Sequence, residues 1–130
     1  MTVCLDTTAY IDLFRGNKAV AQFLSECEKV VVPAAVVAEL FDGFFSTPDS
    51  IEDQVAMELF LSRPNVRFKD ADLSVAMRYG FLARQLRKKG RPIPVNDIWT
   101  AATAFEVGAS AIVSYDRHFD VFDTIRRVAP

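Results

Sequence analysis

Four carboxylates stand at positions from which side chains commonly reach a ligand. Asp6 follows a short β-rich run, TVCL, and Asp116 directly follows a second such run at 111–115. Asp97 stands at the start of a stretch with helical apolar spacing, and Glu39 lies in the helical stretch after a third β-rich run. In a parallel sheet the carboxyl ends of the strands share one edge, where ligands bind. We therefore expect these acids to converge on that edge.

A cluster of carboxylate oxygens is typical of a site for a hard divalent cation. Mg²⁺ prefers one or two carboxylates together with waters and phosphate oxygens. Without a metal, clustered carboxylates repel one another and hold their protons longer than isolated ones. A bound divalent ion relieves that repulsion, orients a water and offsets charge on a transferring phosphate. The pattern thus indicates metal-assisted chemistry on a phosphate ester.

Taken singly, most of these acids have a simpler structural explanation. Asp97 suits the first turn of a helix, where a carboxylate complements the helix dipole. Asp6 and Asp116 suit the turns that end strands. Glu39 is harder to explain in this way, because its neighbours in AAVVAELFDGFF are apolar and a charge among them is costly without a partner.

Three further polar residues lie near the acids in sequence. Asp42, one helical turn beyond Glu39, is either a supporting acid or a solvated residue, and Asp120 is a surface acid or a fifth member of the cluster. His118 is the only histidine of the chain, and we expect it to be a surface or packing residue rather than a catalytic base. Neither a Ser/His/Asp set nor a glycine-rich phosphate loop is expected.

The elements that must position the acids alternate between strands and helices along the chain. Strands are expected at 2–6, 29–33, 65–68, 111–115 and 125–128, of which 65–68 and 125–128 have the weakest patterns. Helices are expected at 7–15, 18–28, 34–45, 50–62, 70–89 and 96–107, followed by a helical turn at 117–123. This alternation predicts an α/β fold, with helices on both faces of a mostly parallel sheet.

Two helices carry specific packing expectations, and one turn has a specific cause. The helix at 34–45 is apolar nearly all round, so most of its surface should be covered. In the helix at 70–89, we expect four residues to face inward: Leu73, Ala76, Met77 and Phe81. Gly108 stands where the last helix should stop, in the left-handed conformation that glycine adopts at little cost.

Length and composition indicate a single domain over residues 1–130 that buries a real core. No apolar run approaches the roughly eighteen residues of a membrane span, and the start lacks a signal sequence. We therefore expect a cytoplasmic protein with no membrane contact, and buried free thiols at Cys4 and Cys27. The net charge of −2 counts against nucleic-acid binding by bulk electrostatics, but not against phosphate binding through a metal.

At these residues the chain resembles the PIN-domain family, and within it the VapC-type toxins of toxin–antitoxin pairs. The resemblance covers nearly the whole chain. It is carried by LDT at Asp6, VVAEL at Glu39, NDIWTAATA at Asp97 and SYDRHF at Asp116. The last two blocks, in that order and spacing, are the specific part.

The resemblance implies a PIN-like three-layer α/β/α fold and a metal-dependent endoribonuclease. The residues that match the family's acidic quartet are Asp6, Glu39, Asp97 and Asp116. These acids would hold Mg²⁺ or Mn²⁺ and activate a water that attacks an RNA phosphodiester. Thr7 and Ser114 fall where the family often carries a hydroxyl, and would support the acids together with Asp42 and Asp120.

The resemblance also implies partners. Family members form homodimers and are silenced by a VapB-type antitoxin that wraps a groove near the site. The stretches FDGFF (41–45) and MELFL (57–61) are the antitoxin-facing surfaces we expect.

Two other functions are compatible with parts of the pattern. One is a non-catalytic PIN-fold module that binds RNA or protein; the intact quartet disfavours it, since such a module is expected to lose one or more acids. The other is a small metal-dependent phosphohydrolase. It ranks lower because neither a phosphate loop nor a pair of aspartate nucleophiles accompanies the acids.

Overall fold

Five strands form one parallel sheet in the computed structural model, which describes residues 1–130. They are β1 (Thr2–Leu5), β2 (Lys29–Pro33), β3 (Val66–Lys69), β4 (Ala111–Val113) and β5 (Arg126–Val128). Their order across the sheet is β3-β2-β1-β4-β5, and every neighbouring pair is parallel. The expected α/β class is confirmed, including the two weakest strands. The strand expected at 111–115 is two residues shorter, because it ends at Val113, and the strands expected at 2–6 and 125–128 are each shorter by one residue.

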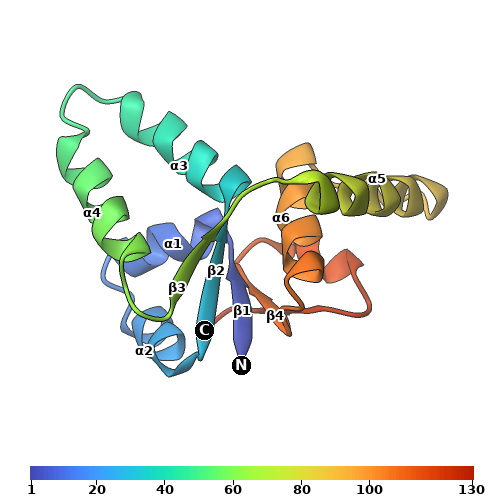
Figure 1. Ribbon diagram of the computed structural model, residues 1–130, viewed down its shortest axis with the longest axis horizontal. Helices are drawn as coiled ribbons and strands as arrows, with labels where there is room; N and C mark the ends of the chain where they lie inside the picture. Colours follow the sequence, from blue (N-terminus) through green and yellow to red (C-terminus); the bar gives the residue numbers. More distant parts are fainter.

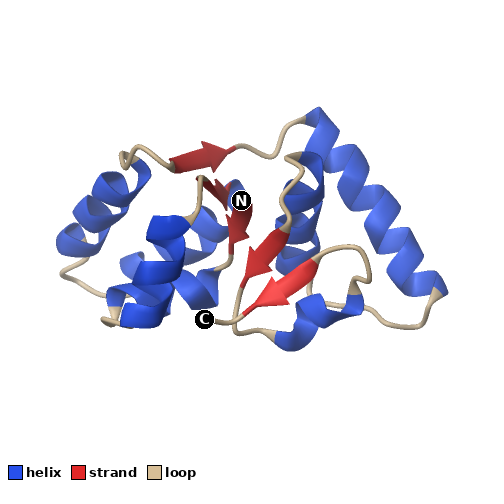
Figure 2. Ribbon diagram, turned by 90° about the horizontal axis from the view of Figure 1, so that it is seen from below, coloured by secondary structure: helices blue, strands red, loops and turns tan.

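Six α-helices and one 3₁₀ helix connect the strands. They are α1 (Thr7–Phe14), α2 (Lys18–Glu26), α3 (Ala34–Phe45), α4 (Ile51–Leu61), α5 (Leu73–Lys88), α6 (Val95–Glu106) and the 3₁₀ helix η1 (Arg117–Val121). Figure 1 shows α1 to α4 on one side of the sheet and α5 with α6 on the other. Figure 2 shows the strands between these two groups. The three-layer α/β/α arrangement is therefore confirmed.

The alternation of side chains along the strands divides the core between the two faces. Val3 and Leu5 point into the cluster that α1 to α4 cover, whereas Cys4, between them, points into the cluster beneath α5 and α6. On β4, Val113 joins the first cluster and Ile112 the second. All five side chains are fully buried, so the central strands are fixed from both faces.

A glycine turn delivers the chain from α6 into β4. Gly108 has a φ of 67°, as expected. Its N–H donates to the carbonyl of Phe105, and the N–H of Ala109 donates to the carbonyl of Ala104. These two bonds form a Schellman motif, which satisfies the last carbonyls of the helix. The reversal leaves the start of α6, with Asp97, at the carboxyl edge of the sheet.

The packing expectation for α5 is wrong. Leu73, Met77 and Phe81 are 76%, 68% and 58% exposed, whereas Val75 and Leu82 on another face of the helix are buried. The helix carries two apolar stripes, and only one of them faces the sheet. The stripe formed by Leu73, Met77 and Phe81 remains uncovered.

The expectation that α3 is covered on most sides is also wrong. Only Val36 and Leu40 are buried, and Glu39 is exposed. Since Glu39 keeps contact with water, its charge does not carry the burial cost that its apolar neighbours suggested. The position of this acid must be judged from its contacts instead.

One expectation from composition, the two buried thiols, is confirmed by the structure. Cys4 and Cys27 are buried free thiols. Burial is the main cause that raises the pKa of both thiols, and the carboxylate of Asp6 adds to the effect at Cys4. None of the helices combines the length and the apolarity that a membrane crossing requires.

Candidate active site

The site lies where the strand order reverses, at the carboxyl ends of β1 and β4. These strands are neighbours in the sheet, but the chain leaves them toward opposite edges. A crevice forms at such a point in open parallel sheets and is their usual ligand site. Asp6 caps α1 directly after β1, and Asp116 caps η1 shortly after β4. Asp97 reaches the same edge from the first turn of α6.

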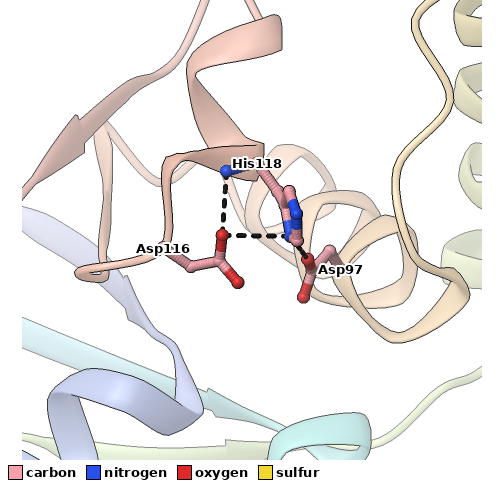
Figure 3. A group of neighbouring side chains, drawn as sticks. All are labelled: Asp97, Asp116 and His118. Atoms are coloured by element: carbon pink, nitrogen blue, oxygen red, sulfur yellow. Dashed lines mark hydrogen bonds and ion pairs between the residues drawn. The ribbon is translucent and has the colours of Figure 1, made fainter.

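Asp97 and Asp116 meet around the imidazole of His118 (Figure 3). His118 Nδ1 lies 2.7 Å from Asp97 Oδ2 and 3.0 Å from Asp116 Oδ1. The backbone N–H of His118 donates a further 2.9 Å bond to Asp116 Oδ1, which closes the turn. One ligand atom from each of the three side chains lies within 4.8 Å of the others, a spacing that suits a bound metal ion.

Asp6 is held by hydroxyl groups. Ser114 Oγ donates a 2.7 Å hydrogen bond to Asp6 Oδ2, and Thr8 Oγ1 donates to the same oxygen at 3.2 Å. The backbone N–H groups of Tyr115 and Asp116 donate in turn to these two hydroxyls, at 2.9 Å each. Asp6 is only 4% exposed and Ser114 is fully buried. The network therefore fixes the direction in which the Asp6 carboxylate points.

Glu39 approaches from α3, on the side of β1 opposite to α6. Thr7, the residue after Asp6, donates a 3.1 Å hydrogen bond from its hydroxyl to Glu39 Oε2. Glu39 is thus tied to the residue next to Asp6, but it lies outside the group of three ligand atoms around His118.

The electrostatics of the site disfavour ionisation of one carboxylate, Asp97. Burial raises the pKa of Asp97, and the charges of Asp6 and Asp116 raise it further, while the hydrogen bond from His118 opposes them. The pKa of His118 is raised, chiefly by its hydrogen bond to Asp97. This donor set fits a divalent cation, which would replace repulsion among acids by attraction to a common charge.

Of the eight residues expected from sequence, two lie apart from this cluster. Asp42 is exposed on α3 and makes no hydrogen bond or ion pair. Asp120 pairs with Arg127 at 2.8 Å, and Arg127 also donates to the backbone carbonyl of Ser114. Asp120 therefore touches the site only through Arg127.

Two members of the site, Thr8 and His118, lie outside the set of residues expected from sequence. Thr8 holds Asp6, and its position two residues after that acid was the available signal. His118 has a side chain that is 49% exposed, in keeping with a surface residue, yet it bridges two acids. Its place two residues beyond Asp116, within one turn of η1, was the signal in this case.

The sequence of the chain is similar to those of known proteins. Residues 3–125 match the family model of the PIN domain. The ribonuclease VapC1 of Haemophilus influenzae (strain R2866) is 31% identical over 123 residues, which cover 92% of this chain and 90% of that protein. The ribonuclease VapC19 of Mycobacterium tuberculosis is 31% identical over 126 residues, covering 94% and 95% of the two chains.

Two solved structures have a fold similar to that of this chain. A chain in the 2.2 Å structure of VapBC-1 from nontypeable Haemophilus influenzae superposes with a TM-score of 0.83 at 28% identity, covering 98% of this chain and 97% of that one. FitAcB from Neisseria gonorrhoeae has the same fold, with a TM-score of 0.79 at 24% identity and coverage of 97% and 96%. The resemblance to the PIN-domain family is thereby confirmed. The chain belongs to the PIN domain family.

Proposed function

We propose that this protein is a metal-dependent endoribonuclease that acts as the toxin of a type II toxin–antitoxin system, with residues 1–130 forming one PIN domain. The observation that carries the proposal is the convergence of Asp6, Asp97 and Asp116 at the reversal of strand order. The relatives named ribonuclease VapC1 and VapC19, aligned over most of the chain, support the same activity. RNA is accordingly the proposed substrate.

The acids proposed to hold the catalytic ion are Asp6, Glu39, Asp97 and Asp116. Mg²⁺ is the expected ion, with Mn²⁺ as a substitute, because both accept carboxylate oxygens and waters. When bound, such an ion activates a water and offsets the charge that develops on a phosphodiester under attack.

The other residues of the site position these acids. Ser114 and Thr8 hold Asp6 in one orientation, so the carboxylate does not reorganise as charge develops. Thr7 holds Glu39 in the same way from the neighbouring position. These hydrogen bonds connect residues of different helices and strands, and they keep the acids in place before the substrate binds.

A VapB-type antitoxin is the proposed protein partner, as for the relatives solved as VapBC complexes. The apolar surface offered to it runs over α1, α3 and α4. A hollow of about 240 Å³ lies there, lined by Tyr10, Ile11, Phe14, Arg15, Leu40, Phe44, Asp53 and Ala56. Beside it, Phe45 is 64% exposed and Leu59 is 67% exposed. Within MELFL, Met57 and Phe60 are buried, so Leu59 is the exposed apolar residue that this stretch offers to a partner.

A second copy of the chain is the proposed partner for the uncovered stripe on α5. Leu73, Met77 and Phe81 recur at every fourth position, so they line one side of the helix. Large exposed apolar patches of this kind mark interaction sites.

We place the toxin, its antitoxin and its RNA substrate in the cytoplasm.

The test is an RNA cleavage assay with purified protein, free of antitoxin. Cleavage should require Mg²⁺ or Mn²⁺, stop with EDTA and fall by orders of magnitude in Asp6→Asn. Asp49→Asn is the matched control, because Asp49 is exposed in the turn between α3 and α4. Metal-independent cleavage would contradict the proposal. If the protein binds RNA but does not cleave it with any of the metals, the non-catalytic module is favoured instead.

A further inference from the structure

We propose that His118 is itself a metal ligand, and that its nitrogen shifts the site from Mg²⁺ toward first-row transition ions. The inference rests on the proposed function, because it takes the acidic edge as the metal site. It adds a donor that the acidic quartet does not contain. It also assigns that donor a consequence, namely the choice of metal.

The positions of the donor atoms carry the proposal. Nδ1 of His118 lies 2.7 Å from Asp97 Oδ2 and 3.0 Å from Asp116 Oδ1. Adjacent ligands of an octahedral ion with bonds of about 2.1 Å lie roughly 3 Å apart. The imidazole nitrogen is therefore spaced from each carboxylate oxygen as neighbouring ligands of one ion are, and all three atoms lie within 4.8 Å of one another.

The turn that holds His118 keeps the imidazole in this place. Asp116 Oδ1 accepts a bond from the backbone N–H of His118, so ligand and imidazole are fixed by the same turn. Asp97 is anchored separately by α6, which packs on the sheet through buried Ile98 and Ala101. The imidazole side chain is 49% exposed, which leaves an open side for water and for a phosphate oxygen.

The chemistry of the exchange is simple. Without metal, a protonated Nδ1 donates a hydrogen bond that is shared between the two carboxylates. A bound ion would take the place of that proton, which would be released to solvent, while Nε2 would keep its own proton. The neutral imidazole thus donates a lone pair where the free protein held a proton.

A nitrogen ligand changes which ions bind well. Mg²⁺ takes oxygen donors, whereas imidazole suits first-row transition ions, whose affinities rise from Mn²⁺ through Co²⁺ to Ni²⁺. A site with His118 as a ligand should therefore prefer Mn²⁺ over Mg²⁺ more strongly than the carboxylates alone would. Removal of the imidazole should weaken Mn²⁺ binding and leave Mg²⁺ binding nearly unchanged.

The experiment uses Mn²⁺ as a paramagnetic probe on protein without a histidine tag. Because His118 is the only histidine, any imidazole nitrogen coupled to bound Mn²⁺ belongs to it. Pulsed EPR should show ¹⁴N modulation in the wild type, and this should change to a ¹⁵N pattern when the protein is grown with ¹⁵N-histidine. His118→Gln should lose the modulation and bind Mn²⁺ at least about tenfold more weakly, the loss typical of a disturbed metal site.

The outcomes separate this inference from the function it rests on. Bound Mn²⁺ without nitrogen modulation in the wild type would overturn the role of His118 and leave the acidic site standing. Absence of Mn²⁺ binding at millimolar concentration would overturn the metal site, and the inference with it. An equal loss of Mg²⁺ and Mn²⁺ affinity in His118→Gln would contradict the selectivity claim. The isotope comparison in the wild type decides the first point even if the variant folds poorly.

Discussion

Ser114 and Asp6, 108 residues apart in sequence, are joined by a 2.7 Å hydrogen bond between a buried hydroxyl and a buried carboxylate. The same hydroxyl accepts the backbone N–H of Asp116. One side chain therefore links the acid after β1 to the acid after β4, across the boundary between the two halves of the sheet. This link sets the relative position of two proposed metal ligands.

Ser114→Ala should lower RNA cleavage by about 10- to 100-fold, the effect seen when groups that orient metal ligands are removed. It should also lower the free energy of unfolding by about 1–3 kcal/mol, because buried partners lose their hydrogen bond. Cleavage rate, metal affinity and urea unfolding measure these effects. Ser110→Ala is the control, since Ser110 is exposed and its hydroxyl bonds only the carbonyl of Thr2. Full activity in Ser114→Ala would show that Asp6 needs no such support.

The pKa of His118 should exceed its ordinary value of 6.5 in metal-free protein, because its imidazolium hydrogen-bonds to Asp97. A folded-state pKa above the unfolded value gives stability that is complete below about pH 6.5 and is lost as pH rises through the raised value. Burial also raises the pKa of Asp97 above 3.8. The stability that Asp97 contributes is therefore likewise lost as pH rises, but in a window at lower pH. The melting temperature of EDTA-treated protein should therefore fall as pH rises through each window.

The C2 proton of His118 reports this pKa directly in an NMR titration. Asp97→Asn should lower the midpoint toward the ordinary value, because the largest cause of the shift is removed. The midpoint in the wild type and the variant would be the same if the hydrogen bond to Asp97 were unimportant.

Phe45→Ser should weaken binding of the antitoxin at least about tenfold, since burying one large apolar side chain is worth about 1.5–3 kcal/mol. Phe45 suits this test better than Phe44, because Phe44 packs partly into the core while Phe45 is 64% exposed. Calorimetry with the purified antitoxin measures the change. Phe81→Ser, on the other side of the sheet, should leave the affinity intact. Equal affinities for all three proteins would remove this surface from the complex.

Met77→Glu should convert a dimer of this chain into a monomer. Met77 is 68% exposed at the centre of the α5 stripe, so a charge there harms self-association without disturbing the core. Light scattering after size exclusion gives the mass of each form. Gln22→Glu adds the same charge at an exposed position on α2 and should remain dimeric. A Met77→Glu dimer would assign the interface to another surface.

The sequence predicted the fold well because alternation and glycine signals are local. Every expected strand and helix exists, and Gly108 ends α6 with the backbone that its position indicated. The face of α5 was not predictable in this way. That helix carries two apolar stripes, and periodicity alone does not reveal which one the sheet covers. Leu73 and Met77 were assigned to the core for that reason, while Val75 occupies it.

Spacing in the sequence predicted those site residues that stand at the end of a strand or the start of a helix. Asp6, Asp97 and Asp116 stand at element boundaries, so a parallel sheet brings them to one edge. The contact of His118 with two acids depends on the exact path of η1, which is set by the turn bond to Asp116. The hydroxyl of Thr8 likewise finds Asp6 only through the local geometry at the start of α1. Such contacts follow from the fold and not from spacing.

The most direct test of the metal site is a thermal melt of the wild type and Asp97→Asn, each with EDTA, MgCl₂ or MnCl₂. An ion that binds only the folded state raises the melting temperature by mass action. We predict a clear rise for the wild type in millimolar metal and none for Asp97→Asn. In EDTA, at a pH above the titration of His118, the variant should melt at or above the wild type, because one repelling charge is gone. The same rise in both proteins, or no rise in either, would contradict a divalent cation at Asp97.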